Sequence, residues 1–402
     1  MSSETDGAIV ILGASFAGVE VVYQLVRAFD GKPPPLIVVD RQSEHGYLPL
    51  VQERLCGVLD PAESRLNTRA FVESVPQARY VQGEVESFDP ATKTVKLANG
   101  TSESGRFAVV ALGSGFEAPA GIDGAQNVLG YKGEADFTRA HEALRGLLEG
   151  AEDRPEIVVV GGGISGCELA GELAALAGTR PTGWSAPKVR LATSAAALVD
   201  SMGAGISSRA TRALEAQGVS IDVSSRVLRV ADGEAHLESA GATKTVRADL
   251  VLWAGGIRPA PILEQLGLPR TDDGWLSVGP TLQCFAEPEM TKPDIFACGD
   301  AVRVRGGDGE WPTMQRAIEC IWQAKVVARN IAELHEQPTD YDEGVPPLQP
   351  HKLRSEFFYG LSLGARSMVL YRGMGLDMPG INHRFRRWLM RQYFARYAPL
   401  PG

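Results

Sequence analysis

Two stretches decide the fold, IVILGASFAG at residues 9–18 and IVVVGGGISG at residues 157–166. Each is a run of apolar, β-branched residues that ends in closely spaced small residues and continues into a helix-like segment. A buried strand, a tight glycine turn and a helix N-terminus together form the site that holds the pyrophosphate of a dinucleotide. The sequence therefore predicts two dinucleotide-binding units in one chain, with electrons passing between two bound dinucleotides.

The first unit has the features that such a site needs. Gly13 permits the tight turn, and Gly18 lets the helix pack closely on the strand. Ser15 stands at the position of the middle glycine and is small enough for a ligand to approach. A second strand, predicted at 36–40, ends in Asp40, which is placed to bind a ribose hydroxyl. A lone fingerprint of this kind is also compatible with a buried β-turn-α unit that holds no ligand.

The second unit repeats this arrangement with one difference. Gly161, Gly163 and Gly166 have the full G-x-G-x-x-G spacing. The strand that follows ends in Thr193 and Ser194, where an acidic residue is expected. An acidic residue there favours NAD and repels the 2′-phosphate of NADP. Its absence leaves both NADH and NADPH open as the bound nucleotide.

Size and composition narrow the class of protein. The chain has 402 residues, 44% of them hydrophobic and 22% charged, which fits a globular protein of two or three domains. No apolar run reaches the roughly 20 residues of a membrane-spanning helix, and we expect the polar, acidic start to be no secretory signal. The five cysteines are scattered without a C-x-x-C pair, which favours a reducing compartment and no metal site. A net charge of −9 argues against a nucleic-acid partner.

The charge is distributed unevenly along the chain. From His351 to the end there are nine Lys/Arg and two Asp/Glu, so this tail carries +7 and the rest carries −16. Residues 381–397 are predicted to form a helix with an apolar and a basic face. The apolar face has Phe385, Trp388, Leu389 and Tyr393, and the basic face has Arg384, Arg387 and Arg391. Such a helix either docks on an anionic membrane surface or packs on its own body or a second subunit, and the sequence leaves these alternatives open.

Further segments extend the pattern of the two fingerprints. Residues 107–114 predict a buried strand that ends in a small-residue turn, and residues 294–301 predict another strand that ends in Gly299-Asp300. Together with residues 253–259, these segments resemble, in order, the flavoproteins with two dinucleotide sites whose fold is that of glutathione reductase. The resemblance implies FAD on the first fingerprint, NAD(P)H on the second, and Asp300 as the residue that holds the ribityl chain of FAD.

This resemblance implies an α/β fold with two interleaved Rossmann-like dinucleotide-binding domains. We expect residues 1–118 and 258–345 to form the FAD-binding domain and residues 119–257 to form the NAD(P)-binding domain. Residues 346–402 then form a C-terminal extension that contains the basic amphipathic helix.

Two branches of these flavoproteins match particular segments. The Asp40-Arg41 pair, the stretch HGYLPLV at 45–51 and the stretch WPTMQRAIE at 311–319 resemble type II NADH:quinone oxidoreductases. In the last stretch Gln315 matches the first glutamine of that family's quinone motif, and Glu319 replaces the second. The turn at 13–18 and the Thr193-Ser194 end also resemble the apoptosis-inducing-factor-like quinone reductases. A thiol relay is disfavoured, because the segment after Asp40 contains only one cysteine.

The predicted site residues follow from the fingerprints and the resemblance together. Glu168 and Glu172 match the two glutamates of the family's helix start, and the resemblance implies that Glu172 lies near the nicotinamide. We therefore assign catalytic roles to Glu172, Gln315 and Glu319. The predicted FAD-binding residues are Gly13, Ser15, Phe16, Ala17, Gly18, Asp40, Arg41, Val85, Ala111, Gly113, Gly299, Asp300 and Ala317. The predicted NAD(P)H-binding residues are Gly161, Gly163, Ile164, Ser165, Gly166, Glu168, Thr193, Ser194, Gly255 and Gly256.

The implied reaction is hydride transfer from NAD(P)H to FAD, followed by electron transfer to a quinone-like acceptor. Two alternatives remain, a flavoprotein reductase of a protein electron carrier and a specialised FAD-dependent oxidoreductase of a small metabolite. A sulfide:quinone reductase is disfavoured, because only Cys56 and Cys320 are available beside the flavin. A non-catalytic NAD-sensing role is a further class. We expect a cytoplasmic protein, with peripheral contact with the cytoplasmic membrane and a homodimer as open alternatives.

Overall fold

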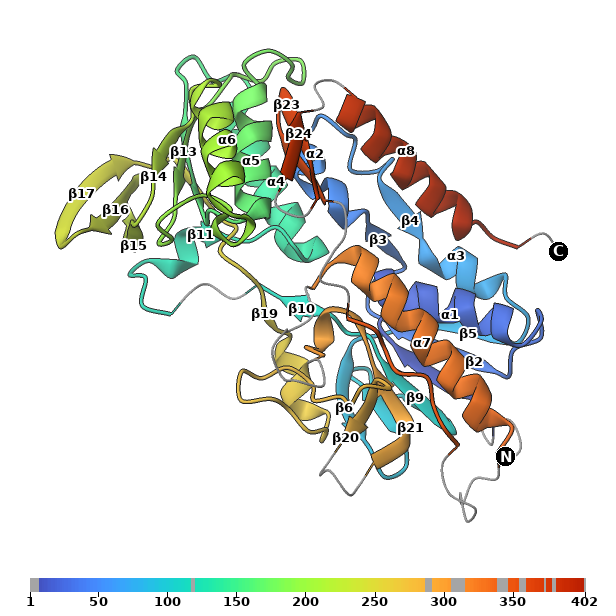
Figure 1. Cartoon of the computed structure of the whole chain (residues 1–402). Helices are drawn as coiled ribbons and strands as arrows, with labels where there is room; N and C mark the ends of the chain where they lie inside the picture. Colours follow the sequence, from blue (N-terminus) through green and yellow to red (C-terminus); the bar gives the residue numbers. More distant parts are fainter. Residues whose placement is uncertain are drawn as a thin grey trace.

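The structure is a computed structural model, and it describes residues 7–116, 120–285, 291–304, 315–337, 346–353, 359–371, 374–377 and 381–400. Two parallel sheets, each with its own helices, lie side by side, and the C-terminal helix packs along the first of them (Figure 1). This arrangement confirms the predicted α/β fold with two interleaved Rossmann-like units.

The first sheet contains the first fingerprint. Its strand order is β20-β21-β9-β1-β2-β5, and all neighbouring pairs are parallel except β20 with β21. Strands β1 and β9 are fully buried and almost wholly apolar, as expected for a parallel sheet that is covered on both faces. The strands are β1 (Ile9–Leu12), β2 (Leu36–Asp40), β5 (Ala78–Gln82), β9 (Phe107–Val110), β20 (Gln283–Phe285) and β21 (Thr291–Ala297).

The second sheet contains the second fingerprint and is parallel throughout, in the order β11-β18-β12-β13-β14. Alternate residues of β12 point to opposite faces, so Ile157 and Val159 join one hydrophobic core and Val158 and Val160 join another. The strands are β11 (Val128–Leu129), β12 (Glu156–Val160), β13 (Lys188–Ala192), β14 (Ser220–Asp222) and β18 (Leu250–Trp253).

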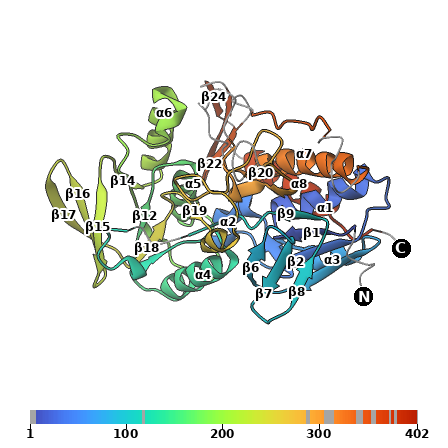
Figure 2. The same cartoon turned by 90° about the horizontal axis from the view of Figure 1, so that it is seen from below.

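Helices and small antiparallel sheets cover the two parallel sheets. In the first unit, α1 and α7 pack side by side on one face, and the sheet β6-β7-β8 lies on the other (Figure 2). In the second unit, α4, α5 and α6 cover one face and the sheet β15-β16-β17 covers the other. The helices are α1 (Phe16–Ala28), α2 (Val51–Leu55), α3 (Thr68–Glu73), α4 (Glu134–Leu148), α5 (Ile164–Ala175), α6 (Ala204–Glu215), α7 (Ala317–His335) and α8 (Ile381–Arg396). The antiparallel strands are β3 (Glu44–Gly46), β4 (Arg65–Asn67), β6 (Val85–Asp89), β7 (Thr94–Leu97), β8 (Ser102–Ser104), β15 (Arg226–Ala231), β16 (Glu234–Ser239) and β17 (Ala242–Arg247).

The chain passes between the two units at a short antiparallel pair. Strands β10 (Ser114–Gly115) and β19 (Arg258–Pro259) pair side by side, one leading into the second unit and one leading out of it. These crossings lie close to the proposed boundaries of the inserted domain, 119 and 257. The division into residues 1–118 and 258–345, 119–257 and 346–402 stays a proposal.

The C-terminal sheet lies directly on the second unit. It consists of β22 (Tyr359–Leu363), β23 (Arg366–Tyr371) and β24 (Met374–Asp377), all antiparallel. Strand β22 packs against α5, and the approach is close because Gly171 has no side chain. A Cβ atom at Gly171 would lie 2.5 Å from the carbonyl carbon of Leu363.

Helix α8 packs on the body of the protein. Met390, Tyr393 and Tyr397 are buried and belong to the core of the first unit. Phe385 and Trp388 are half exposed, and their rings stack with centroids 5.7 Å apart. The predicted helix is therefore confirmed, and the residues of its apolar face differ in burial, because Tyr393 is buried whereas Phe385, Trp388 and Leu389 are 39–51% exposed.

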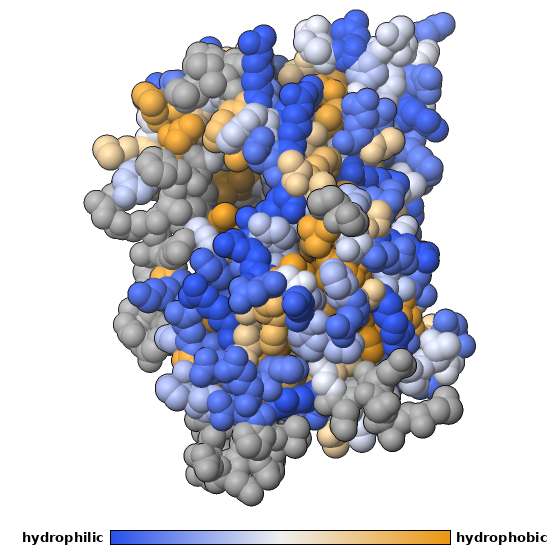
Figure 3. Space-filling model, turned by 90° about the vertical axis from the view of Figure 1, so that its right-hand side faces the viewer, coloured by the Kyte–Doolittle hydropathy of each residue, from blue (hydrophilic) through white to orange (hydrophobic). Residues whose placement is uncertain are grey.

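The side of the molecule that carries α8 is shown in space-filling form in Figure 3, where hydrophobic residues lie among hydrophilic ones, some of them on the floor of a hollow. In the part of the chain that the structure describes, no helix is both long enough and apolar enough to cross a membrane.

The packing of β22 on α5 gives a first prediction. We expect Gly171→Ala to destabilise the protein by about 1–3 kcal/mol, because the added methyl group meets backbone atoms that cannot move aside. Gly146→Ala is the matched control, since Gly146 lies at an exposed position of helix α4 with open space around it. There the same change stabilises the helix by about 0.5–1 kcal/mol. Urea unfolding of both variants measures the two effects, and equal effects would contradict the proposed contact.

Candidate functional site

A single large cleft joins the two units. Its volume is about 2230 Å³, and residues of both parallel sheets and of helix α8 line it. Sixteen of the predicted site residues line this cleft: Gly13, Ser15, Phe16, Ala17, Asp40, Arg41, Val85, Ala111, Gly113, Ile164, Ser165, Glu168, Gly256, Asp300, Gln315 and Ala317. The cleft therefore brings together residues as far apart in the sequence as Gly13 and Ala317.

The first glycine turn is closed by two contacts that only glycine allows. Gly13 has φ +99°, and a Cβ atom there would lie 2.3 Å from the carbonyl oxygen of Ala111. A Cβ atom at Gly18 would lie 1.8 Å from the carbonyl oxygen of Gly13. Helix α1 thus begins directly at the end of β1, and its first N–H groups face the cleft beside Ser15.

Asp40 is fixed at the end of β2 beside this turn. Its Oδ2 accepts a hydrogen bond from the Ala14 N–H at 2.7 Å, and its Oδ1 accepts one from the Gln42 N–H at 2.9 Å. Burial raises the pKa of the Asp40 carboxyl, and these backbone hydrogen bonds oppose that effect. The carboxylate lines the cleft at the position expected for an acceptor of ribose hydroxyls.

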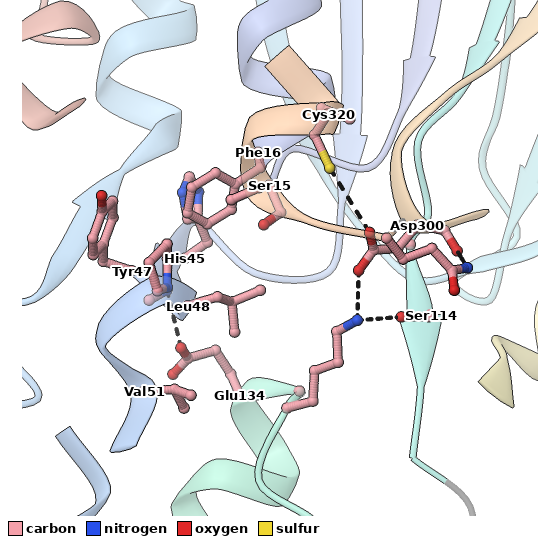
Figure 4. Close-up of a pocket in the computed structure, with 18 of the residues that line it drawn as sticks. Ser15, Phe16, His45, Tyr47, Leu48, Val51, Ser114, Glu134, Asp300 and Cys320 are labelled. Atoms are coloured by element: carbon pink, nitrogen blue, oxygen red, sulfur yellow. Dashed lines mark hydrogen bonds and ion pairs between the residues drawn. The ribbon is translucent and has the colours of Figure 1, made fainter. Parts of the chain in front are cut away.

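Helix α7 and the residues just before it hold the late Gly-Asp turn. Gln323 Oε1 accepts a hydrogen bond from the Gly299 N–H at 2.7 Å, and the Gln315 amide donates one to the Asp300 carbonyl at 3.0 Å. Figure 4 shows Asp300 with Ser114 and Cys320 at one end of the cleft. Lys132 donates to Asp300 Oδ2 at 2.5 Å and to Ser114 Oγ at 2.6 Å.

The second glycine turn repeats the geometry of the first. Gly161 has φ +124°, and a Cβ atom at Gly166 would lie 1.8 Å from the Gly161 carbonyl oxygen. A Cβ atom at Gly163, the N-cap of α5, would meet nothing within 4 Å. Gly163 therefore faces open space, which fits a turn that a dinucleotide pyrophosphate approaches. Thr193 is buried behind this turn, whereas Ser194 is exposed.

Four features of the cleft wall fit FAD. The first turn presents helix N–H groups, and Asp40 offers a fixed carboxylate beside them. Asp300 keeps one oxygen, Oδ1, whose nearest partner among the described residues is the Cys320 thiol at 3.9 Å. Gln52, also in the wall, is 5% exposed, and its Oε1 lacks a hydrogen-bond partner among the described residues. A buried acceptor without a partner is costly, and a ligand with N–H or O–H donors satisfies it.

The two glutamates of α5 lie at different depths. Glu168 lines the cleft, and Arg386 of α8 lies 3.4 Å from its Oε1. Glu172, one turn further along, is not among the cleft-lining residues, and its Oε1 accepts a hydrogen bond from Ser362 at 3.2 Å. Burial raises the pKa of Glu172 to about 7. The catalytic role assigned to Glu172 stays a prediction.

Glu319 also points away from the cleft. Its Oε1 lies 2.5 Å from His351 Nε2, and neither residue lines the cleft. The expectation that a carboxylate here needs a partner is met by His351, and the catalytic role assigned to Glu319 stays a prediction. Residues 311–314 of the quinone-motif stretch lie outside the described residues. The remaining predicted cofactor-binding residues do not line the cleft, and their ligand-binding roles stay predictions: Gly18, Gly161, Gly163, Gly166, Thr193, Ser194, Gly255 and Gly299.

The sequence comparisons identify the family. The sequence profile described as pyridine nucleotide-disulphide oxidoreductase matches residues 7–324, which is more than half of the chain. The chain belongs to the pyridine nucleotide-disulphide oxidoreductase family. Its cofactors are accordingly FAD and a nicotinamide nucleotide.

Curated relatives of this oxidoreductase fall into two functional groups. The chain is 26% identical over 347 residues to demethylphylloquinone reductase NdbB of Synechocystis, covering 82% of each chain. It is 25% identical over 354 residues to type II NADH:quinone oxidoreductase NdhA of Mycobacterium tuberculosis, covering 83% of this chain and 73% of that one. It is also 27% identical over 300 residues to the nitric oxide reductase FlRd-NAD(+) reductase of Aeromonas salmonicida, covering 74% and 71%.

Among solved structures, the fold is similar to that of NDH2 from Plasmodium falciparum in complex with NADH. The TM-score is 0.80 at 13% sequence identity, and the match covers 98% of this chain and 96% of that one. The resemblance to type II quinone oxidoreductases is thus confirmed for both sequence and fold.

Several residues of the oxidoreductase cleft were not predicted from the sequence. His45 is buried between Phe16 and Tyr393, and its Nε2 lies 2.9 Å from the Tyr393 hydroxyl of α8. Burial lowers the pKa of His45 to about 4, so this imidazole is neutral at pH 7. Lys132 was missed as well. His45 begins the HGYLPLV stretch but was given no role, and Lys132 belongs to no motif; Tyr393 and Asp300, which they contact, lie far away in the sequence.

A buried charge cluster ties α8 to the rest of the oxidoreductase. Arg387 Nε lies 3.0 Å from Glu53 Oε2, and His383 Nδ1 lies 3.3 Å from Glu53 Oε1. The hydrogen bond with Glu53 raises the pKa of His383 to about 9. Burial alone would raise the pKa of the Glu53 carboxyl. His383, Arg386 and Arg387 lower this pKa overall. The other end of α8 is held by Arg396 and Tyr397, which both contact the buried carboxylate of Glu20.

This cluster predicts a pH dependence of stability. The folded-state pKa of His383, about 9, lies above its ordinary value of 6.5, so the folded state holds an extra proton between these pH values. The stabilisation is complete below about pH 6.5 and is lost as the pH rises through 9. Because His383 is partly exposed, we expect a loss of about 2 kcal/mol across this window.

The measurement is urea unfolding of the FAD-loaded protein at several pH values. We expect His383→Gln to flatten the profile between about pH 6.5 and 9, whereas His236→Gln, in strand β16 on the far side of the second unit, leaves it unchanged. An unaltered slope in the His383 variant would show that the cluster does not titrate in this window.

Proposed function

We propose that this protein is an NAD(P)H:quinone oxidoreductase, of the EC 1.6.5 type. The observation that carries the proposal is the shape of the cleft, which extends from the Asp300 turn to the exposed apolar side chains Phe385 and Leu389 of α8. An apolar acceptor reaches the flavin site along such a wall. NAD(P)H, a proton and a quinone give NAD(P)⁺ and a quinol.

Some cleft residues bind the cofactor, and others exclude water from it. FAD, when bound, supplies the two-electron relay between the nicotinamide and the acceptor. In the proposal the first turn and Asp40 hold its adenosine half, and Asp300 holds its ribityl chain. Gln315, just before α7, fixes the Asp300 turn. Phe16, Tyr47 and Tyr393 pack together with ring centroids 4.7–5.8 Å apart and keep water from this wall.

The nicotinamide nucleotide is proposed to bind at the second turn, in either form. Thr193 and Ser194 provide no negative charge at the end of β13. The nearest carboxylate in the adjacent strand, Asp222, is paired with Arg190 at 2.7 Å and with Lys244. This local charge balance does not repel the 2′-phosphate of NADPH. Glu168, Ile164 and Ser165 then line the part of the cleft between the nucleotide and the flavin.

The acceptor is proposed to enter beside α8. Phe385, Trp388 and Leu389 are 39–51% exposed on this helix, and Arg384 and Arg391 are exposed next to them. Aromatic and basic side chains on one exposed helix face suit the surface of an anionic bilayer. The protein would accordingly act in the cytoplasm at the inner face of the cytoplasmic membrane. A homodimer that covers the same side chains is the competing arrangement.

A second candidate is a reductase of a protein electron carrier. It is favoured by the relatives named nitric oxide reductase FlRd-NAD(+) reductase, although their match spans 300 residues against 347–354 for the quinone reductases. In that case the basic side chains of α8 would contact an acidic carrier.

One experiment separates these acceptors. The purified, FAD-containing protein is mixed anaerobically with NADH or NADPH, and then with a soluble quinone, ferricyanide, sulfide or a rubredoxin-type carrier. We expect the flavin absorbance to bleach with both nucleotides and to recover with the quinone at catalytic rates. A protein that releases no flavin on denaturation, or one that has no quinone-dependent turnover, contradicts the proposal.

The exposed face of α8 gives a further prediction. We expect the double variant Phe385→Ser/Trp388→Ser to bind anionic vesicles about tenfold less tightly, because two aromatic anchors are removed. Its turnover with quinone in vesicles falls in parallel, and by more than its turnover with a soluble quinone. Met374→Ser/Leu376→Ser is the control, since these side chains are 69% and 66% exposed on β24. Equal vesicle binding of the two double variants would remove the membrane role of α8.

A further inference from the structure

The segment from Lys132, in the loop after β11, to Glu134, the first residue of α4, contacts the first unit at two points. Lys132 reaches Asp300 and Ser114, and Glu134, two residues later, reaches Gly46, Arg54 and Arg65. Both side chains line the cleft. The same short segment of the nucleotide-binding unit thus makes a contact with the Asp300 turn and a separate contact with the far wall (Figure 4).

The Glu134 contact is an interdomain clamp. Its Oε1 accepts from the Gly46 N–H at 3.0 Å and from Arg54 Nη2 at 3.2 Å, and its Oε2 accepts from Arg65 at 3.0 Å. The Arg54 side chain is fully buried and lies over the Phe137 ring of α4 at 4.2 Å. This clamp fixes where the loop sits, and therefore where Lys132 sits, without contacting Asp300.

The Lys132 contact places a positive charge inside the flavin site. Its ammonium is held by Asp300 Oδ2 and Ser114 Oγ, and its side chain is only 25% exposed. Asp300 Oδ1 remains available to a ribityl hydroxyl, so the carboxylate can bind the lysine and the ligand together. Reduction by two electrons adds negative charge to a flavin, and a fixed cation nearby stabilises that charge more than it stabilises the neutral oxidised ring.

We propose that Lys132 is a positioning residue of the flavin site, whose ammonium, anchored on Asp300 and Ser114, raises the reduction potential of bound FAD. This inference rests on the FAD-dependent function and not on the identity of the acceptor. Because Lys132 belongs to the nucleotide-binding unit, the potential of the flavin is set in part by how the two units are joined. The lysine neither accepts nor donates the transferred hydride.

The test is the midpoint potential of the FAD-loaded protein, measured by slow reduction with dithionite against a reference dye, in the absence of NAD(P)H and quinone. We expect Lys132→Met to lower the equilibrium constant for two-electron reduction at least tenfold, which is about 30 mV for a two-electron couple. Lys132→Arg keeps the charge and retains the wild-type potential. Ser114→Ala, which removes one anchor, gives a smaller shift of the same sign.

Glu134→Gln is the matched control. It weakens the clamp two residues away and lowers the stability of the protein, but it leaves the ammonium of Lys132 on Asp300, so we expect a smaller shift of its potential than in Lys132→Met. A shift in Glu134→Gln as large as that in Lys132→Met would overturn the proposal, since domain placement alone would then set the potential. An unchanged potential in both Lys132→Met and Ser114→Ala overturns it as well. Absence of bound FAD from the wild-type protein would instead reject the flavoenzyme function itself.

Discussion

The structure depends on one steric constraint, the close approach of a helix start to the turn before it. In both turns a Cβ atom on the last glycine would lie 1.8 Å from a carbonyl oxygen of the first, at Gly18 over Gly13 and at Gly166 over Gly161. The first glycine of each turn also lies against the backbone just after the neighbouring strand of its sheet. Gly13 contacts Ala111 after β9, and Gly161 contacts Ala254 after β18. Side chains are excluded at these positions, and in return the helix N–H groups stay free at the edge of the sheet, where a phosphate binds.

Sequence reasoning succeeded where the signal is local. The fingerprints, strand β2 with Asp40 at its end, and the Gly299-Asp300 turn are each determined by neighbouring residues, and the structure brings Asp40 and Asp300 into one cleft. The same reasoning did not give the partners of Glu172 and Glu319. Helical spacing states which residues share a face, but the partner of that face comes from distant segments, here β22 for Glu172 and His351 for Glu319. Lys132 gave no signal, because its role arises from a contact across 168 residues.

The uneven charge of the chain has a structural explanation in α8. Its cations neutralise carboxylates that are nearly or fully buried, with Arg387 and His383 on Glu53, Arg386 beside Glu168, and Arg396 on Glu20. A buried carboxylate without such a partner is strongly destabilising, so each of these pairs couples the tail helix to the body of the protein. The tail is therefore part of the cleft wall, and only its outward side chains remain for another surface to contact.

The two turns share a geometry, yet their surroundings favour different residence times for what they bind. The first turn is enclosed by segments from the whole chain, since α7 holds the Asp300 turn, Lys132 comes from the other unit, and Tyr393 of α8 packs on Phe16 with ring centroids 4.7 Å apart. The second turn faces open space at Gly163, and no acidic side chain stands at the end of its strand. Several of these contacts between distant segments bound the first site, whereas none of them bounds the second. This difference is what an enzyme needs when one dinucleotide stays bound and the other is consumed in every turnover.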